Sequence, residues 1–467
     1  MGSKKFYLQN KSFYFILKEK RGNMKKILLF VSMISTSPMA LSLDPFFVYT
    51  QNTPEGCINA DTTKELDLPT LIQIGICHNP ALNRDYMSVK ASEAALGATK
   101  SDYLPTVDAT ASASKSSAKI EGNKKETTSP YSGNIGLKWL IYDFGARGAT
   151  TDQMQAYLNS ASFSYNASLK NTVLAINQAY FDYLSNEEVL KSTQETMKSY
   201  KKSFEETSKR YKLGMAALSD KLLAQTTYKK SELAVIEAKN ALKKSGATLA
   251  TLLNLPTDTE FKLTLPPKDK DITAISTQMS VQEMMEEALK LRPELKNAES
   301  KEKAAKYSID IAKASHYPSL SANASAGYNN YWSGDKSYRA TGSAGLSLSV
   351  PLFNGFRTTY DVAKARYQYA EAQHTTVETQ DSVKKEVFNA YQDYQTAVSA
   401  YKVNKDVLES AKESERVSFK SYQAGKESIL NLLTTQAELA SARQGVATSF
   451  YNVLIAKANL YRAIGQF

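Results

Sequence analysis

Histidine and cysteine are scarce in this chain of 467 residues, and their scarcity limits the chemistry that the chain can carry out. The three histidines, His78, His316 and His374, lie far apart in the sequence, and no nucleophile motif stands beside them. We also find no glycine-rich phosphate-binding loop and no metal-ligand spacing. We therefore expect a protein that is not an enzyme, with no catalytic residues, cofactor or metal site.

Long apolar runs are also lacking near the N-terminus. Met24-Lys25-Lys26 precedes the apolar run Ile27–Met33, and small residues follow as far as Ser42. Because the run is too short to span a bilayer, we expect residues 1–42 to be an N-terminal extension and a cleavable signal peptide rather than a membrane anchor. Residues 1–23 are either a mis-assigned upstream start or a long basic leader, so both Met1 and Met24 stay open as the true start.

The net charge of +11 comes largely from this leader. Residues 1–42 hold eight basic residues and one acidic residue, which leaves 50 basic and 46 acidic residues in the rest of the chain. A mature chain with a net charge of +4 lacks the excess of positive charge that nucleic-acid binding requires. We expect no nucleic-acid partner.

The two cysteines, Cys57 and Cys77, both lie near the mature N-terminus. In an exported protein such a pair is most simply a disulfide, which would restrain the unfolded chain by roughly 3 kcal/mol. Only His78 lies close enough to complete a metal site, which is too few ligands. Cys57 lies well beyond the signal peptide, so we expect no lipid anchor.

The chain contains two copies of one structural unit. A shift of 211 positions carries Ile176–Tyr183 onto Val387–Tyr394, and a shift of 213 carries Asn79–Leu82 onto Arg292–Leu295. Such self-similarity indicates a duplicated fold. We expect a first repeat over residues 43–265, a linker or equatorial segment over 266–280, and a second repeat over 281–467.

Each repeat contains two segments in which apolar and polar residues alternate. They span about residues 106–114 and 134–142 in the first repeat, and about 319–328 and 343–352 in the second. A polar loop, 115–132, separates the first pair, and a shorter loop near 333–336 separates the second. Alternation of this kind with aromatic residues at the strand ends is typical of outer-membrane β-strands. A half-exposed soluble sheet is the alternative, and four segments in matched pairs favour the membrane.

Four strands are too few to close a barrel, and a sheet cannot leave open edges in lipid. Single-chain barrels begin at eight strands. Several chains must therefore contribute four strands each, and three chains would make a barrel of 12 strands.

Long helical patterns fill most of the remaining chain and form a hairpin in each repeat, at about 146–254 and 355–464. The first helix of each hairpin would reach roughly 100 Å at a rise of 1.5 Å per residue. Its apolar stripe, for example Val173, Ile176, Tyr180 and Tyr183, indicates packing against a neighbouring helix. The equivalent stripe in the second repeat is expected at Phe388, Tyr391, Tyr394, Val398 and Tyr401.

These segments together resemble the TolC-like outer-membrane efflux and secretion ducts, the outer membrane factors. The resemblance covers residues 66–464 and rests on motifs that recur in order: N-P-A-L at 79–82, L-K-W-L-I-Y-D-F-G at 137–145, G-L-S-L-S-V-P-L-F-N-G at 345–355, and the two turn motifs that begin at Arg210 and Ser421. It implies a mainly helical homotrimer with a membrane β-barrel and a periplasmic α-barrel. It also implies recruitment by a periplasmic adaptor and an inner-membrane transporter, with outer-membrane lipid around the barrel.

The resemblance places a gate at the two helical turns, where Gly214 and Gly425 allow the chain to reverse. Tyr422, the repeat equivalent of Tyr211, matches a gate tyrosine of the family, and Asp220 matches a partner aspartate. The family's gate arginine falls on Glu427, and its acidic constriction ring falls on Asn431 and Thr434. Glu427 could itself form a ring of three carboxylates that attracts cations, or it could be a solvated turn residue.

Two functions stay open from the sequence. One is a passive, gated exit duct of an efflux or type I secretion system, located in the outer membrane and extending into the periplasm. The other is a non-transporting coiled-coil scaffold or adhesin of the envelope. The alternating strands favour the duct because a scaffold needs no lipid-facing hairpins. Neither the cargo nor the identity of the partners can be read from the residues.

Overall fold

The computed structural model describes residues 64–118, 126–128, 131–265, 279–333 and 335–466. The expected leader at 1–42, Cys57 and most of the expected linker at 266–280 lie outside these residues. None of the helices in the described part combines the length and apolar character needed to cross a bilayer.

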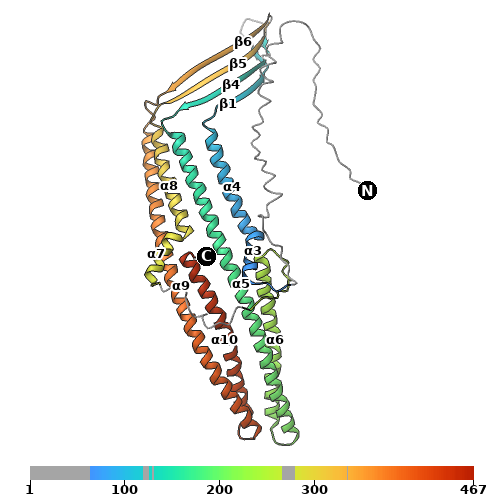
Figure 1. The fold of residues 1–467 in the computed structure, drawn as a ribbon. Helices are drawn as coiled ribbons and strands as arrows, with labels where there is room; N and C mark the ends of the chain where they lie inside the picture. The colour runs from blue at the N-terminus through green and yellow to red at the C-terminus, as the bar shows by residue number, and fades with distance from the viewer. Residues whose placement is uncertain (1–63, 119–125, 129–130, 266–278, 334, 467) are drawn as a thin grey trace, which may run out of the picture. The chain divides into compact units, whose positions relative to one another are not determined.

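The predicted duplication is visible in the order of the elements (Figure 1). The first repeat contains α3 (Leu68–His78), α4 (Pro80–Ser101), β1 (Thr106–Ala113), β4 (Tyr131–Tyr142), α5 (Ala146–Lys212) and α6 (Leu218–Leu252). The second contains α7 (Val281–Leu291), α8 (Pro293–Ala314), β5 (Ser319–Ser333), β6 (Asp335–Ser349), α9 (Arg357–Gln423) and α10 (Ile429–Ile464). The fold class predicted from the sequence, mainly helical with a four-stranded sheet and an internal repeat, is confirmed.

The four long strands form one antiparallel sheet in the order β1-β4-β5-β6, so that β1 and β6 are its edges. The register aligns the alternating patterns of all four strands, as when Leu137 pairs with Ala324 and Ala322 with Leu346. One face is consequently apolar and the other carries Ser, Thr, Asn and Lys. The apolar side chains are exposed, with Ile135 at 54% and Leu346 at 72%, which suits a surface that faces lipid.

The strands differ from the prediction at their ends. Residues 115–132, predicted as a polar loop, include the short paired strands β2 (Ser116–Ala118) and β3 (Glu126–Thr128). β5 and β6 continue into the predicted loop near 333–336, because main-chain pairing in a hairpin does not depend on side-chain alternation. β6 ends at Ser349 rather than near 352, since Pro351 has no amide hydrogen to donate to the ladder.

α5 is the central helix, and it packs on α3, α4, α6, α8 and α10. α9 packs on α7, α8 and α10. Near the sheet the helices therefore follow one another in the order α4, α5, α8, α9. Towards the hairpin turns the order is α6, α5, α10, α9. Each of α5 and α9 has 67 residues, so each runs for about 100 Å.

The same three positions form the core of each repeat. In the first repeat Leu71, Ile176 and Leu249 are almost fully buried together, and their equivalents in the second are Met284, Val387 and Leu460. The stripe predicted on α9 is wrong at one position, because Phe388 is 47% exposed. Val387, one residue earlier in α9, faces the core instead.

In both connections from a strand to a long helix, two consecutive residues have positive φ. These are Phe144 and Gly145 before α5, and Gly355 and Phe356 before α9. Positive φ is uncommon for phenylalanine, so neighbouring contacts must hold the turn. Phe144 stacks on Tyr317 at a ring distance of 5.7 Å, which fastens the first repeat to the second.

An arginine stabilises the first of these connections, between β4 and α5. Arg147 pairs with Asp143 at 2.9 Å and donates to the carbonyls of Leu140 and Ile141 at 2.7 and 3.0 Å. Its guanidinium also lies 4.6 Å from the ring centre of Tyr103 at the end of α4. One side chain therefore ties together the end of β4, the start of α5 and the end of α4.

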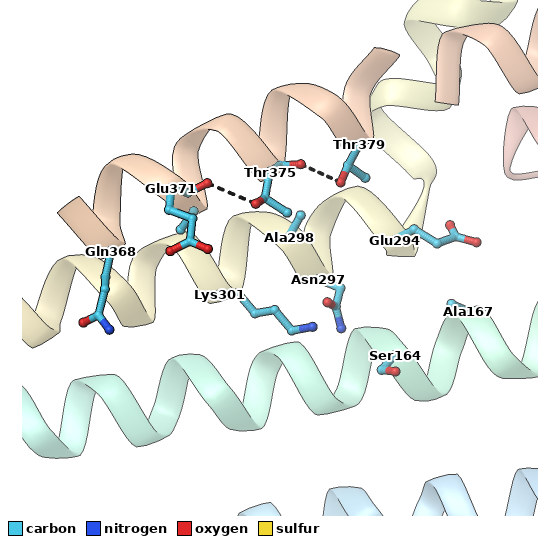
Figure 2. A pocket seen from close by; sticks show the side chains of 11 residues that line it. Ser164, Ala167, Glu294, Asn297, Ala298, Lys301, Gln368, Glu371, Thr375 and Thr379 are labelled. Atoms are coloured by element: carbon cyan, nitrogen blue, oxygen red, sulfur yellow. Dashed lines mark hydrogen bonds between the residues drawn. The ribbon is translucent and has the colours of Figure 1, made fainter. Parts of the chain in front are cut away.

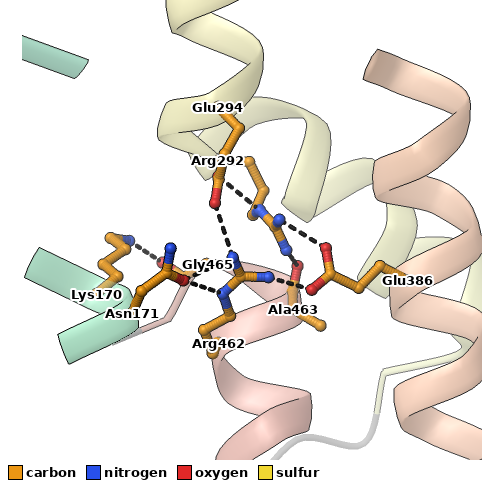
Figure 3. Close-up of polar contacts among 8 residues, drawn as sticks. All are labelled: Lys170, Asn171, Arg292, Glu294, Glu386, Arg462, Ala463 and Gly465. Carbon is orange, nitrogen blue, oxygen red and sulfur yellow. Dashed lines mark hydrogen bonds and ion pairs between the residues drawn. The ribbon is translucent and has the colours of Figure 1, made fainter. Parts of the chain in front are cut away.

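The start of α8 is anchored by an ion-pair network around a buried arginine (Figure 3). Arg292, whose side chain is 4% exposed, donates to Glu386 of α9 at 2.7 Å and to Glu294 at 2.9 Å. It also donates to the carbonyl of Ala463 at the end of α10, at 3.0 Å. The guanidinium thus joins three helices.

The end of α10 is held by the same network. Arg462 pairs with Glu294 at 2.9 Å and with Glu386, and it donates to Asn171 of α5 at 2.7 Å. Lys170 donates to the carbonyl of Gly465 at 2.8 Å, and its burial lowers the pKa of its ammonium group. The last helix of the chain is therefore bound to α5, α8 and α9 together.

The first repeat makes the equivalent junction without charges. Asn79, which occupies the position of Arg292, donates to the carbonyl of Leu252 at the end of α6 at 3.0 Å, and it caps α4 through Ala81. A 7% exposed asparagine thus replaces the arginine network. The duplicated halves share a fold and differ in how the helix ends are fastened.

Candidate functional site: the hairpin turns

The turns that join α5 to α6 and α9 to α10 have the same main-chain geometry. Gly214 and Gly425 lie at φ values of 72° and 73°, the left-handed region that glycine reaches without strain. In each turn the amide after the glycine donates back to the last turn of the helix, from Met215 to Arg210 at 2.8 Å and from Lys426 to Ser421 at 2.9 Å. This bonding is the Schellman motif, which ends both helices sharply.

Tyr422 lies at the centre of the contact between the two hairpins. Its side chain is 4% exposed, and its hydroxyl is 2.8 Å from the hydroxyl of Thr207 on α5. The guanidinium of Arg210 lies 4.6 Å from its ring centre and donates to the carbonyl of Gln423. Two side chains of the first hairpin therefore hold the end of α9.

The equivalent tyrosine of the first hairpin has no such role. Tyr211 is 37% exposed, and its ring is approached by Lys221 of its own hairpin at 5.1 Å. The side chain of Asp220, in the first turn of α6, makes no hydrogen bond or ion pair in the described part of the chain. Tyr211 and Tyr422 occupy equivalent positions in the two repeats, but only Tyr422 is buried between the hairpins.

A row of buried polar side chains continues the contact away from the turns. Gln436 of α10 is 3% exposed and exchanges hydrogen bonds with Ser203 of α5 at 3.0 and 3.1 Å. It also donates to Glu415 of α9 at 3.2 Å. The sequence prediction missed Thr207, Arg210 and Ser203 on α5 and Gln436 on α10, because nothing in the local pattern of either helix distinguishes them from solvated residues.

Glu427 follows the turn of the second hairpin and is held in place. Its Oε1 accepts hydrogen bonds from Ser418 at 2.9 Å and from the side chain of Asn431. Thr434 donates to the carbonyl of Leu430 in its own helix. Glu427, Asn431 and Thr434 line one open groove between α9 and α10, in which Glu409, Glu413 and Glu438 also lie. The structure therefore brings the three predicted constriction residues together on one acidic surface.

The remaining predicted site residues lie elsewhere. Cys77 is buried in α3, and Cys57 lies outside the described residues, so the disulfide between them stays a prediction. In the part of the chain that the structure describes, no cluster of His, Cys, Asp and Glu has the arrangement of a metal site.

Comparison with known proteins finds relatives of both repeats. The sequence model of the outer membrane efflux protein family matches residues 71–255 and 284–466, once for each repeat. Protein CyaE of Bordetella pertussis is 26% identical over 393 residues, which are 82% of this chain and 81% of CyaE. The probable efflux pump outer membrane protein TtgC of Pseudomonas putida is 25% identical over 412 residues, 85% of this chain and 82% of TtgC.

Solved structures show the same fold. A crystal structure of CusC, from a study of its folding and transmembrane channel formation, superposes with a TM-score of 0.74. It is 19% identical and covers 87% of this chain and 95% of CusC. The predicted resemblance is confirmed, and a non-transporting scaffold is disfavoured. The chain belongs to the outer membrane efflux protein family and is an outer-membrane exit duct of an efflux or secretion system that extends into the periplasm.

Proposed function

We propose that the duct is a homotrimer whose three sheets close a 12-stranded barrel. The observation that carries this proposal is the open amphipathic sheet, whose edges β1 and β6 have no partner strand in the described chain. Unpaired edges are not stable in lipid, and four strands are too few for a barrel. The exposed apolar face would then contact outer-membrane lipid.

The helices support a periplasmic tunnel below this barrel. α5 and α9 follow β4 and β6 after short connections and are far longer than a 30 Å hydrocarbon layer is thick. A periplasmic adaptor and an inner-membrane transporter would recruit the tunnel and supply energy and cargo. The duct itself would then be passive, without catalysis.

The turns would form the gate of this tunnel. In the structure the second hairpin is bound to the first by the Tyr422–Thr207 hydrogen bond and by Arg210. Opening would require these contacts to break in each subunit. Tyr211, Gly214, Asp220 and Gly425 would then be turn residues that shape the tip without closing it.

Glu427 would give the gate its ionic preference. Hydrogen bonds from Ser418 and Asn431 fix its carboxylate at the groove, and three such carboxylates around a threefold axis would attract cations. Asn431 would orient the carboxylate, and Thr434 would line the passage beside it.

Two measurements on the detergent-extracted protein test the proposal. The first determines its oligomer mass, and the second records single channels in a planar bilayer. A trimer with small, discrete and mostly closed openings is expected, whereas a monomer without conductance would refute the barrel. Glu427→Gln should lower the preference for cations, with Glu438→Gln as the control in the same groove. Unchanged selectivity would remove Glu427 from the constriction.

A further inference from the structure

The polar face of the sheet carries three charged side chains. They are Asp108 on β1, Lys138 on β4 and Arg339 on β6, and all three are exposed. The register places each of them on the same face as the Ser, Thr and Asn residues. In a closed barrel the apolar face contacts lipid and the polar face lines the lumen, so these charges would border the path of a solute.

Asp108 and Lys138 lie close enough to offset each other. Asp108 pairs with Gly136 and Lys138 pairs with Thr106, which are neighbouring positions of one face. Side chains at such diagonal positions have Cβ atoms about 7 Å apart. Their opposite charges therefore largely cancel for a solute in the lumen, and the end of the sheet nearest α5 is close to neutral.

Arg339 lies far from this pair. It is level with Ser132 of β4, because both residues pair with Asn329. Ser132 precedes Lys138 by six residues, or about 20 Å, and the level of Asp108 is about 13 Å away along the strands. Both distances exceed the screening length of about 8 Å at physiological ionic strength. Neither Lys138 nor Asp108 therefore alters the field close to Arg339 by much.

The residues around Arg339 supply no negative charge in the described part of the sheet. Its cross-strand partner Asn329 and the next residue on its face, Thr341, are neutral. The Thr341 hydroxyl donates to the carbonyl of Gly327 at 3.4 Å. Arg339 makes no ion pair within the described residues. Because a guanidinium group stays protonated in proteins, this positive charge is permanent and uncompensated.

The polar pockets of the helices have the opposite charge. The pocket between α5, α8 and α9 is lined by the carboxylates of Glu294 and Glu371 and by the ammonium group of Lys301 (Figure 2). The groove at the second hairpin contains four glutamates and Lys426. The uncompensated positive charge therefore belongs to the sheet, which α9 separates from the acidic groove at the hairpin turns.

We propose that Arg339 gives the outer part of the barrel lumen a preference for anions. This inference rests on the proposed homotrimer, in which three guanidinium groups line the lumen at one level. They attract solutes that carry carboxylate, sulfonate or phosphate groups, and they repel cations. The duct then favours cations at the ring of Glu427 and anions at the ring of Arg339, so that its entrance and its exit select opposite charges.

A reporter cysteine measures this field. Thr341→Cys places a thiol on the face of Arg339, two residues or about 7 Å along the strand. The purified trimer in lipid nanodiscs is treated with a methanethiosulfonate that carries either a sulfonate or a trimethylammonium group, with the parent chain treated in parallel as the background. Mass spectrometry gives the two rates, and their ratio removes any change in the reactivity of the thiol itself.

Arg339→Gln should lower the ratio of the anionic to the cationic rate by about fivefold at 0.01 M salt and by about twofold at 0.15 M, because salt screens the charge. Arg339→Lys keeps the charge and should keep the ratio. Trimers of unchanged mass that give the same ratio with Gln and Lys at position 339 would overturn the inference and leave the proposed duct intact.

Ala340→Cys is the matched control for the lumen itself. Ala340 is exposed beside Arg339 but lies on the apolar face, which lipid covers in the closed barrel. Neither charged reagent should modify it at an appreciable rate. If Ala340→Cys reacts as fast as Thr341→Cys, lipid does not separate the two faces, and the proposed barrel is refuted together with its lumen.

Discussion

Replacing Tyr422 by phenylalanine should shift the duct towards its open state. The substitution keeps the ring and its contact with Arg210, and it removes only the hydroxyl that bonds Thr207 at 2.8 Å. Thr207 also donates to the carbonyl of Ser203, so it is not left without a partner. The loss should therefore be that of one buried hydrogen bond, about 1 kcal/mol per subunit.

The effect multiplies if the three hairpins open together. Three lost bonds then weaken the closed state of the trimer by about 3 kcal/mol, which is about a hundredfold in the ratio of closed to open states. Tyr422→Ala should act further in the same direction because it also removes a buried ring. The fraction of time spent open in single-channel recordings measures both effects.

Tyr211→Phe is the matched control, since Tyr211 is the repeat equivalent of Tyr422 and is 37% exposed. It should leave the open fraction nearly unchanged. The oligomer mass of each variant must equal that of the wild type, so that a change in opening is not a loss of assembly. If Tyr422→Phe and Tyr211→Phe open the channel equally, or neither does, the assignment of the gate contact is wrong.

Three further predictions concern stability. Gly425→Ala should weaken the closed tip by about 1 kcal/mol, measured by urea unfolding, because its φ of 73° strains alanine although no atom lies near the added methyl group. Arg292→Ala should lower the free energy of unfolding by about 2 kcal/mol, since it removes hydrogen bonds to the partly exposed Glu386 and to the carbonyl of Ala463, and an unchanged urea midpoint would contradict this. Burial raises the pKa of Tyr180 to about 12, and its hydroxyl bonds the carbonyl of Thr264, so the folded state keeps a proton that the unfolded chain loses near pH 10. Wild-type stability should therefore fall between pH 10 and 12, and Tyr180→Phe, less stable by about 1 kcal/mol at pH 8, should lose this deficit over that range.

The sequence predicts this fold well where local signals coincide with the repeat. Helix α5, expected to begin near residue 146 and to end before Gly214, is observed at Ala146–Lys212, because glycine in the left-handed region stops a helix wherever it occurs. The strands could also be predicted from a local signal, because the alternation of apolar and polar residues has a period of two, which a helix does not have. Their outer ends could not be predicted, because hairpin pairing continued beyond the alternating residues.

The contacts of the site were harder to predict than its position. Gly425 and Tyr422 can be found from the duplicated motif, but the partner of Tyr422 is Thr207, a residue 215 positions away. The same holds for Arg292 and Glu386, which are 94 positions apart. A sequence pattern indicates which face of a helix is buried, and it does not indicate which helix covers that face.

The ion-pair network at the end of α10 also sets the order in which the exported chain can fold. Lys170 and Asn171 find their partners in Gly465 and Arg462, more than 290 positions later. Translation and export deliver the chain from its N-terminus, so this part of α5 reaches the periplasm long before the residues that complete its contacts. The periplasmic half can therefore close only when Arg462 and Gly465 have crossed the inner membrane. A chain truncated before Arg462 would keep its strands and its first hairpin but lack the contacts that fasten α5 to α10, leaving an unfinished wall for periplasmic proteases to attack.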